Sequence, residues 1–86
     1  MTKEDKKKLK EILANKELNR LDARWLMEVI FNNSYFELSH HTNIKPMWLK
    51  EQLTAIKIFT KDSQEKILQA SFKLTQKKPK IILKND

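Results

Sequence analysis

Apolar residues recur every three to four positions along most of this chain, which is the spacing of one face of an α-helix. Several of these stretches begin with a capping pair, in which a Ser, Thr, Asn or Asp precedes an acidic residue by three positions. These pairs are Thr2 with Asp5, Asn19 with Asp22, Ser34 with Glu37 and Asp62 with Glu65. The pattern predicts an all-α fold, a small five-helix domain with helices at about 3–15, 20–31, 35–41, 46–57 and 62–74.

The C-terminal end departs from the helical pattern. Pro79 lacks an N–H group and is expected to stop the last helix before the short apolar run KIILK at 80–84. That run is read as a short extended arm, an edge strand or a basic tail. The whole chain is expected to be one domain. Its parts are a basic amphipathic flanking helix at 1–17, a core at 20–74 and the tail or short β arm at 75–86.

The predicted core follows from the apolar stripes of the five helices. Trp25 is expected to anchor the second helix in this core, because a large aromatic ring buries a large apolar area. The other residues expected to face inward are Leu9, Ile12, Leu13, Leu21, Leu26, Val29, Ile30, Leu49, Leu53, Ile56, Ile67, Leu68, Ser71 and Phe72.

Glycine is absent from the chain, so another residue has to occupy turn positions that need a positive φ angle. Asparagine tolerates the left-handed conformation better than other residues with a Cβ atom. The five asparagines at 15, 19, 32, 33 and 43 stand where the apolar spacing breaks. They are therefore predicted to be turn and cap residues.

The net charge of +7 lies almost entirely in the second half of the chain. Residues 1–43 carry eight basic and seven acidic side chains, whereas residues 44–86 carry ten and four. This asymmetry favours a polyanionic partner for the second half. Only Arg20 and Arg24 are arginines. Lysine binds phosphate as a point charge but is a poorer bidentate reader of guanine, so strong salt dependence is expected.

Several functional classes find no support in the sequence. There is no cysteine, no glycine-rich phosphate loop and no recognisable nucleophile pattern, so we expect no enzyme activity, no catalytic residue and no cofactor. His40 and His41 are adjacent on a predicted helix and point about 100° apart, which argues against a shared metal ion. The basic N-terminus lacks the apolar core of a signal peptide, and no apolar run is long enough for a membrane span. We expect a cytoplasmic protein without a membrane partner.

One stretch, SYFELSHHTNIKPMWLKEQL at 34–53, carries a specific spacing. Leu38 and Ser39 form an apolar-then-small pair, Asn43 stands at a turn four residues later, and Ile44 and Leu49 follow. This spacing resembles the helix-turn-helix of lambda-repressor-like (Cro/XRE) DNA-binding domains, over about residues 20–74. Gln52 stands where that family often has another apolar residue.

The resemblance implies a sequence-specific transcriptional regulator that places helix 46–57 in the major groove of double-stranded DNA, as a homodimer. Lysines would contact phosphate or guanine, Met47 a thymine methyl group and Glu51 a cytosine amine. Two residues at the start of the preceding helix would hold the DNA backbone. The implied DNA-binding residues are Ser34, Tyr35, Lys45, Met47, Lys50, Glu51, Thr54, Lys57 and Lys61.

Two other functions fit the same residues. A small phage or mobile-element accessory protein can bind a host or phage protein through a helix-turn-helix-like scaffold, because a fold does not fix a function. Phe36, Met47 and Trp48 would then be interface hot spots. A non-specific nucleic-acid binder would instead rely on the lysine-rich tail. For every named residue, an ordinary role in packing or solvation is the competing interpretation.

Overall fold

The structure of the 86-residue chain, a computed structural model, describes the backbone of residues 2–15 and 17–84, and side chains in these ranges as far as Thr75. It contains α1 (Lys3–Ala14), α2 (Arg20–Ile30), α3 (Tyr35–Thr42), α4 (Pro46–Leu53) and α5 (Lys61–Lys84). The described residues include no strand. The predicted all-α fold with five helices is confirmed.

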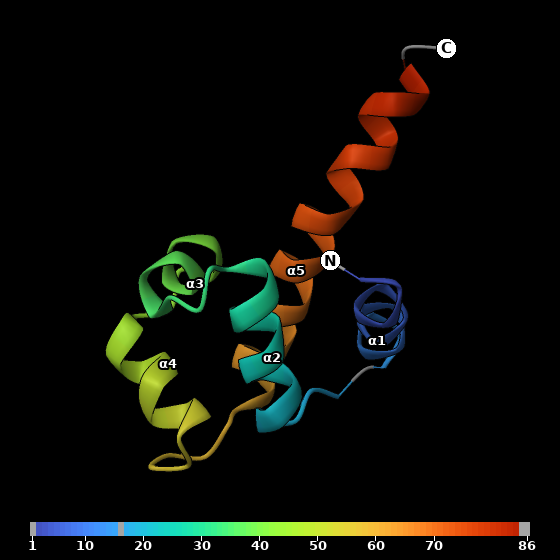
Figure 1. Cartoon of the computed structure of the whole chain (residues 1–86). Helices are drawn as coiled ribbons and strands as arrows, with labels where there is room; N and C mark the ends of the chain where they lie inside the picture. Colours follow the sequence, from blue (N-terminus) through green and yellow to red (C-terminus); the bar gives the residue numbers. More distant parts are fainter. Residues whose placement is uncertain (1, 16, 85–86) are drawn as a thin grey trace.

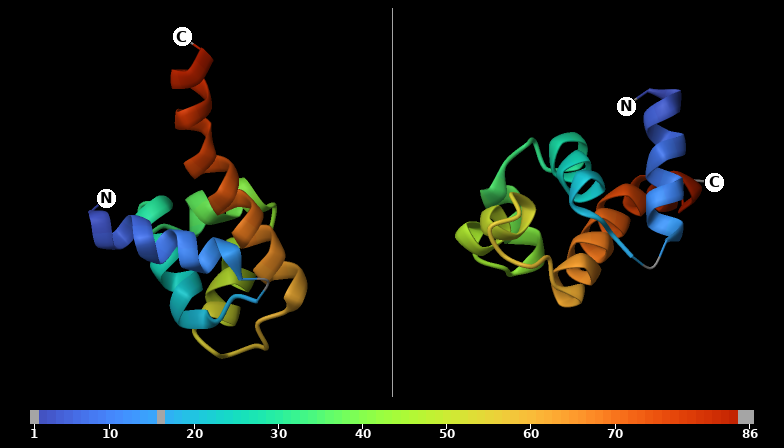
Figure 2. Two further views of the ribbon diagram at one scale, coloured as in Figure 1. Left: turned by 90° about the vertical axis from the view of Figure 1, so that its right-hand side faces the viewer. Right: turned by 90° about the horizontal axis from the view of Figure 1, so that it is seen from below.

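Helix α5 is the element around which the other helices gather. It contacts α1, α2 and α3, while α4 packs on α2 and α3. Figure 1 shows α3 and α4 on one side of α5 and α1 on the other, with α2 between them. The view from below in Figure 2 shows the same arrangement. Helix α4 is therefore the most peripheral element on its side of the molecule.

The core draws on all five helices and on the connections between them. Its buried apolar members are Leu9, Ile12, Leu18, Ala23, Leu26, Met27, Phe31, Leu38, Ile44, Leu49, Leu53, Phe59, Ile67 and Ala70. Trp25 and Leu13 are only partly buried and pack against this cluster. Most of the predicted inward positions are thus confirmed.

Three predicted core positions are wrong, because Leu21, Ile56 and Phe72 are exposed. On α2 the buried positions are Ala23, Leu26 and Met27, a stripe that leaves Leu21 76% exposed. The sequence pattern favoured the larger leucine, whereas packing against neighbouring helices selected the stripe containing the small Ala23. A small residue lets helices approach closely, which single-helix periodicity does not reveal.

The capping residues predicted from the sequence begin three of the helices. The Thr2 hydroxyl accepts from the Asp5 amide and the Asp5 carboxylate accepts from the Thr2 amide, which closes a capping box on α1. Asn19 and Ser34 cap α2 and α3 through their side-chain oxygens. These groups satisfy amides that a helix leaves without internal partners.

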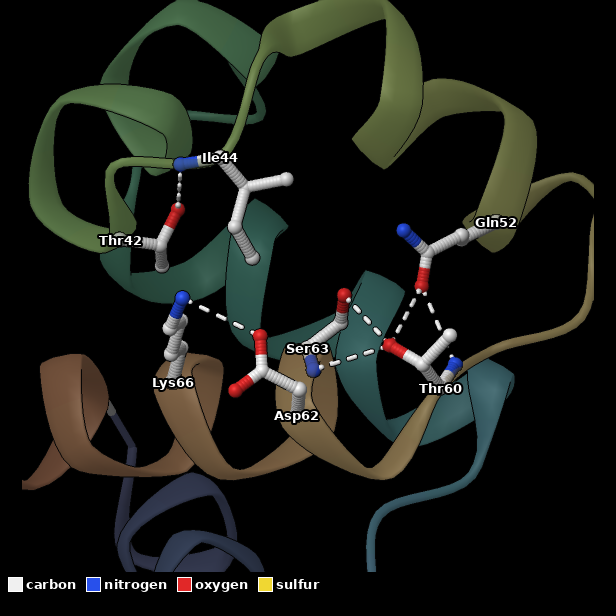
Figure 3. Close-up of polar contacts among 7 residues, drawn as sticks. All are labelled: Thr42, Ile44, Gln52, Thr60, Asp62, Ser63 and Lys66. Carbon is white, nitrogen blue, oxygen red and sulfur yellow. Dashed lines mark hydrogen bonds and ion pairs between the residues drawn. The ribbon is translucent and has the colours of Figure 1, made fainter.

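The predicted cap of α5 at Asp62 is wrong, and the capping group lies at Thr60. The Thr60 hydroxyl accepts from the Ser63 amide at 3.1 Å. Asp62 lies in the first turn of α5 and forms an ion pair with Lys66, Oδ2 to Nζ 3.1 Å (Figure 3). Thr60 can reach this position because Phe59, just before it, is buried and fixes the path of the chain.

Turns in this glycine-free chain use residues with a Cβ atom at positive φ. Asn32, Asn33 and Asn43 have φ angles of 56°, 53° and 61°, as the sequence predicted for turn residues. The unexpected member is Ala55, with φ of 68°. An alanine gains no side-chain hydrogen bond in this conformation, so its backbone carries a cost of about 1–2 kcal/mol.

Helix α4 ends at Leu53, four residues before the predicted end. In a continuing helix the Gln52 carbonyl would accept from the Ile56 amide. Instead, the Arg20 Nε atom donates to that carbonyl at 2.7 Å, and the Ile56 amide donates to the Glu51 carbonyl at 2.9 Å. The left-handed Ala55 and the bond from Ile56 to Glu51 end α4 and turn Ile56 outward, while Arg20 satisfies the Gln52 carbonyl that the helix leaves without a partner.

At the C-terminus the structure differs from the predicted end of the last helix at 74. Helix α5 continues through Pro79 to Lys84, and its last turns extend away from the other helices (Figure 1). The apolar run at 80–84 thus belongs to a helix and not to an extended arm or strand. The lysines of this segment are good helix formers, but a proline inside a helix costs about 3 kcal/mol through one lost hydrogen bond and a clash of its ring with the preceding turn.

Replacing Ala55 by glycine tests the strained turn after α4. We expect Ala55→Gly to raise the free energy of unfolding by about 1 kcal/mol, because glycine adopts positive φ without a Cβ clash. Ala14→Gly, at the end of α1, is the matched control and should lower it by up to about 1 kcal/mol. Urea denaturation measures both values. A loss of stability in Ala55→Gly would contradict the strained conformation.

A second stability test concerns Ser71, whose buried hydroxyl has no hydrogen-bond partner among the described residues. Removing an unsatisfied buried group relieves its desolvation cost. Ser71→Ala should therefore leave the free energy of unfolding unchanged or raise it by up to about 1 kcal/mol. Ser63→Ala is the control. Its hydroxyl accepts from Thr60, so its loss should cost about 1 kcal/mol. A cost above about 1 kcal/mol for Ser71→Ala would show that its hydroxyl is bonded.

Candidate nucleic-acid interface on helix α4

The turn between α3 and α4 fixes the start of α4. Asn43 takes the left-handed conformation, and its amide donates to the Ser39 carbonyl at 2.8 Å. The buried Thr42 hydroxyl donates to the Leu38 carbonyl at 2.7 Å. It also accepts from the Ile44 amide at 3.3 Å (Figure 3). Three consecutive residues thus satisfy the backbone groups at the end of α3 and set the direction of the chain into Pro46.

One side of α4 holds it on the domain. Leu49, Gln52 and Leu53 are buried, and Ile44 just before the helix joins the same core. Successive residues of a helix are about 100° apart, so the side opposite these anchors carries Met47, Glu51 and Thr54. The sequence predicted Met47, Glu51 and Thr54 as outward-facing, and they share one face of α4.

The lysines of α4 lie on both flanks of this outer face. Lys50 and Trp48 are two positions apart on opposite sides of Met47 and Glu51, by the same helical geometry. Lys50 is exposed. Lys45 is also exposed, and its Nζ atom lies 5.8 Å from the centre of the Trp48 ring, which places it on the Trp48 flank. The two predicted lysines are therefore distributed across α4 and do not form one cluster.

Positive charge continues beyond the end of α4. Lys57, in the loop, and Lys61, at the start of α5, are both exposed as predicted. The Thr54 hydroxyl donates to the Lys50 carbonyl at 2.6 Å, so it is left to act as an acceptor. Ser34 and Tyr35 come from the start of α3 and are partly buried. The Ser34 hydroxyl already accepts from the Glu37 amide, which leaves it free to donate.

Sequence reasoning missed the contacts that fix the loop after α4. Arg20 reaches from α2 and donates to the Gln52 carbonyl through Nε and to the Lys57 carbonyl through Nη2, at 2.7 and 2.9 Å. The Gln52 side-chain oxygen accepts from the Thr60 amide at 3.1 Å (Figure 3). The only signal in the sequence was Gln52 itself, a polar residue at a position where the resembled family often has an apolar one.

The same region exposes large apolar side chains. Met47 and Trp48 on α4 are 70% and 58% exposed, and Ile56 and Ile58 in the loop are 67% and 81% exposed. Trp48, Ile56 and Ile58 line an open groove of about 680 Å³, whose other lining residues are Glu51, Gln52, Lys57 and Thr60. Exposed apolar side chains that gather at one place mark a binding surface more often than scattered ones do.

Metal binding, membrane insertion and similarity to known proteins are three further kinds of evidence on function. Within the described part of the chain, no group of three His, Cys, Asp or Glu side chains is placed to hold a metal ion. No helix in that part has the length and apolar character to cross a membrane. Comparison with protein-family models, curated proteins and solved structures finds no match to this chain.

Replacing Arg20 by lysine tests the bridge that positions the loop. Lysine lacks the fork that lets Arg20 bond two carbonyls, so Arg20→Lys should lower the free energy of unfolding by about 1–2 kcal/mol. Amide exchange at Ile56 and Lys57 should speed up as well. Arg24→Lys, on the exposed side of the same helix, is the control and should change stability by less than about 0.5 kcal/mol. Equal effects of the two substitutions would argue against the bridge.

Proposed function

We propose that this protein is a sequence-specific, DNA-binding transcriptional regulator that inserts α4 into the major groove. The observation that carries the proposal is the way α4 is held. Leu49 and Leu53 anchor one side, the left-handed Asn43 sets the entry, and the outer face projects from the periphery of the molecule. The net charge of +7 gives the chain a long-range attraction to a polyanion.

The distribution of the lysines supports this orientation. The major groove is about 12 Å wide, and a helix lying in it has a phosphate backbone on each side. Lys50 on one flank and Lys45 on the other can each reach the nearer backbone. Lys57 and Lys61 extend the basic surface past the C-terminal end of α4. These four side chains supply phosphate contacts, which position a protein on the duplex without reading its sequence.

The outer face of α4 would contact the base edges and so determine which DNA sequence is preferred. Met47 can contact a thymine methyl group, Glu51 can accept from a cytosine amine, and Thr54 can accept from a base donor. Neither arginine takes part, because Arg20 is engaged in the bridge to α4 and Arg24 lies on α2. Readout of guanine by an arginine fork is therefore not expected, and the preferred site should be defined mainly by thymine methyl groups and by base amines.

A single copy of α4 contacts few base pairs. Two copies related by a two-fold axis would double the site and place their helices in successive major grooves, about 34 Å apart. We therefore include a homodimer on a palindromic site in the proposal. Repression or activation would follow from where that site lies relative to a promoter.

The salt dependence of duplex binding tests the phosphate contacts. If four lysines per copy each contact one phosphate, the slope of log affinity against log salt is about −3.6 per copy, and affinity falls about 150-fold between about 50 and 200 mM. Lys50→Ala should weaken binding and make the slope less steep by about one. Fluorescence anisotropy with a labelled duplex measures both quantities.

The control for this test is Lys10→Ala, which removes an exposed lysine of α1. It should leave the slope unchanged, because α1 lies on the far side of α5 from α4 (Figure 1). Equal effects of the two variants would mean that only net charge matters and would contradict docking through α4. A selection from random duplexes that yields no preferred sequence would replace a specific regulator with a non-specific binder.

A further inference from the structure

The groove beside α4 has a different character from the outer face of that helix. Its three exposed apolar side chains are Trp48 from α4 and Ile56 and Ile58 from the loop. Trp48 lies on the flank opposite Lys50, so a ligand in the groove contacts a surface about 160° around α4 from Lys50. Only Glu51 belongs to both the groove and the outer face.

The loop between α4 and α5 is held in place by hydrogen bonds on both of its sides. The Ile56 and Lys57 amides both donate to the Glu51 carbonyl, at 2.9 and 3.0 Å. Arg20 holds the Lys57 carbonyl from one direction, and Gln52 holds the Thr60 amide from another. A loop with this many backbone partners presents Ile56 and Ile58 to solvent in a set position. The groove is therefore preformed, which lowers the entropic cost of binding.

The charges around the groove determine what can fill it. Lys57 lines it, Lys45 lies over the Trp48 ring, and Lys61 follows Thr60 at its edge, against the single acid Glu51. A second copy of this chain that paired groove to groove about a two-fold axis would bring the same three lysines against each other. Single-stranded nucleic acid would suit the lysines and Trp48, but Ile56 and Ile58 offer no aromatic platform for the bases.

We propose that this groove binds an acidic amphipathic helix of another protein, whose apolar stripe covers Trp48, Ile56 and Ile58. A helix in a groove supplies apolar residues at every third or fourth position, which suits three apolar contacts along one depression. Its Asp and Glu residues, at the borders of the stripe, would meet Lys45, Lys57 and Lys61. This interaction does not depend on the proposed DNA binding.

The probe for this test is a synthetic helical peptide with leucines on one face and glutamates on the other. Two companion peptides serve as references, one with the same composition in scrambled order and one with lysines in place of the glutamates. Tryptophan fluorescence of a Trp25→Phe protein reports on Trp48 alone, because the chain has two tryptophans. The acidic helix should shift the emission to shorter wavelength, and both references should bind at least about tenfold more weakly.

Matched protein variants locate the binding site. Ile58→Ser should weaken peptide binding at least about tenfold, as expected for an anchor of an interface. Leu21→Ser removes a leucine of similar exposure on α2, outside the groove, and should have no effect. Lys50→Ala should also leave peptide binding unchanged while it weakens duplex binding, so the two proposals fail independently.

Several results would overturn the groove proposal. The first is binding of the scrambled peptide as tight as that of the acidic helix, and the second is an Ile58→Ser variant that still binds the helix fully. A third is preferential binding of single-stranded oligothymidine that Ile58→Ser abolishes, which would assign the groove to nucleic acid. A fourth is a dimer in sedimentation that Ile58→Ser dissociates, which would assign it to a second copy.

Discussion

The burial of Ile44 and Leu49 on either side of the start of α4 is the constraint on which the rest of the structure depends. Both side chains belong to the core cluster that also holds Leu38 of α3. Burying an aliphatic side chain of this size is worth about 1.5–3 kcal/mol, which exceeds the cost of about 1–2 kcal/mol for a left-handed residue at Asn43. The turn is therefore stable without glycine, and α4 has one side committed to the core and the other turned outward.

The sequence predicted what short-range physical chemistry decides. The caps at Thr2, Asn19 and Ser34 and the left-handed Asn43 follow from side-chain oxygens and backbone sterics within a few residues. The early end of α4 and the exposure of Ile56 could not be predicted, because they involve an alanine in the left-handed conformation, Ala55, and a bond from Arg20, which lies 32 residues before Gln52. The placement of Leu21 failed for a related reason, since the choice between two helix faces is made by neighbouring helices. Among the site residues, the exposure of the lysines was predictable. The placement of Lys45 and Lys50 on two flanks of α4 was not, because only the contact between Lys45 and the Trp48 ring assigns Lys45 to the Trp48 flank.

Helix α4 and the loop after it carry two surfaces that suit different ligands. The flanks and the end of the helix carry lysines, which suit phosphates, whereas Trp48, Ile56 and Ile58 provide an apolar surface that DNA phosphates cannot cover. Arg20 serves both surfaces indirectly, because it fixes the end of α4 and the path of the loop. Lys45, Lys57 and Lys61 border both surfaces, so a protein helix in the groove would compete with DNA for these three lysines. Because the Arg20 bridge fixes both the end of α4 and the loop after it, one contact from α2 positions both surfaces.

The most direct test of this account is a two-dimensional NMR titration of the ¹⁵N-labelled protein with a pool of random duplexes at low salt. We expect the largest amide shifts on residues 45–54 and smaller ones at Ser34 and Tyr35, while α1 stays unchanged. Shifts centred on α1 or on the described part of α5, with residues 45–54 unaffected, would contradict the claim that the outer face of α4 is the surface this fold presents to DNA.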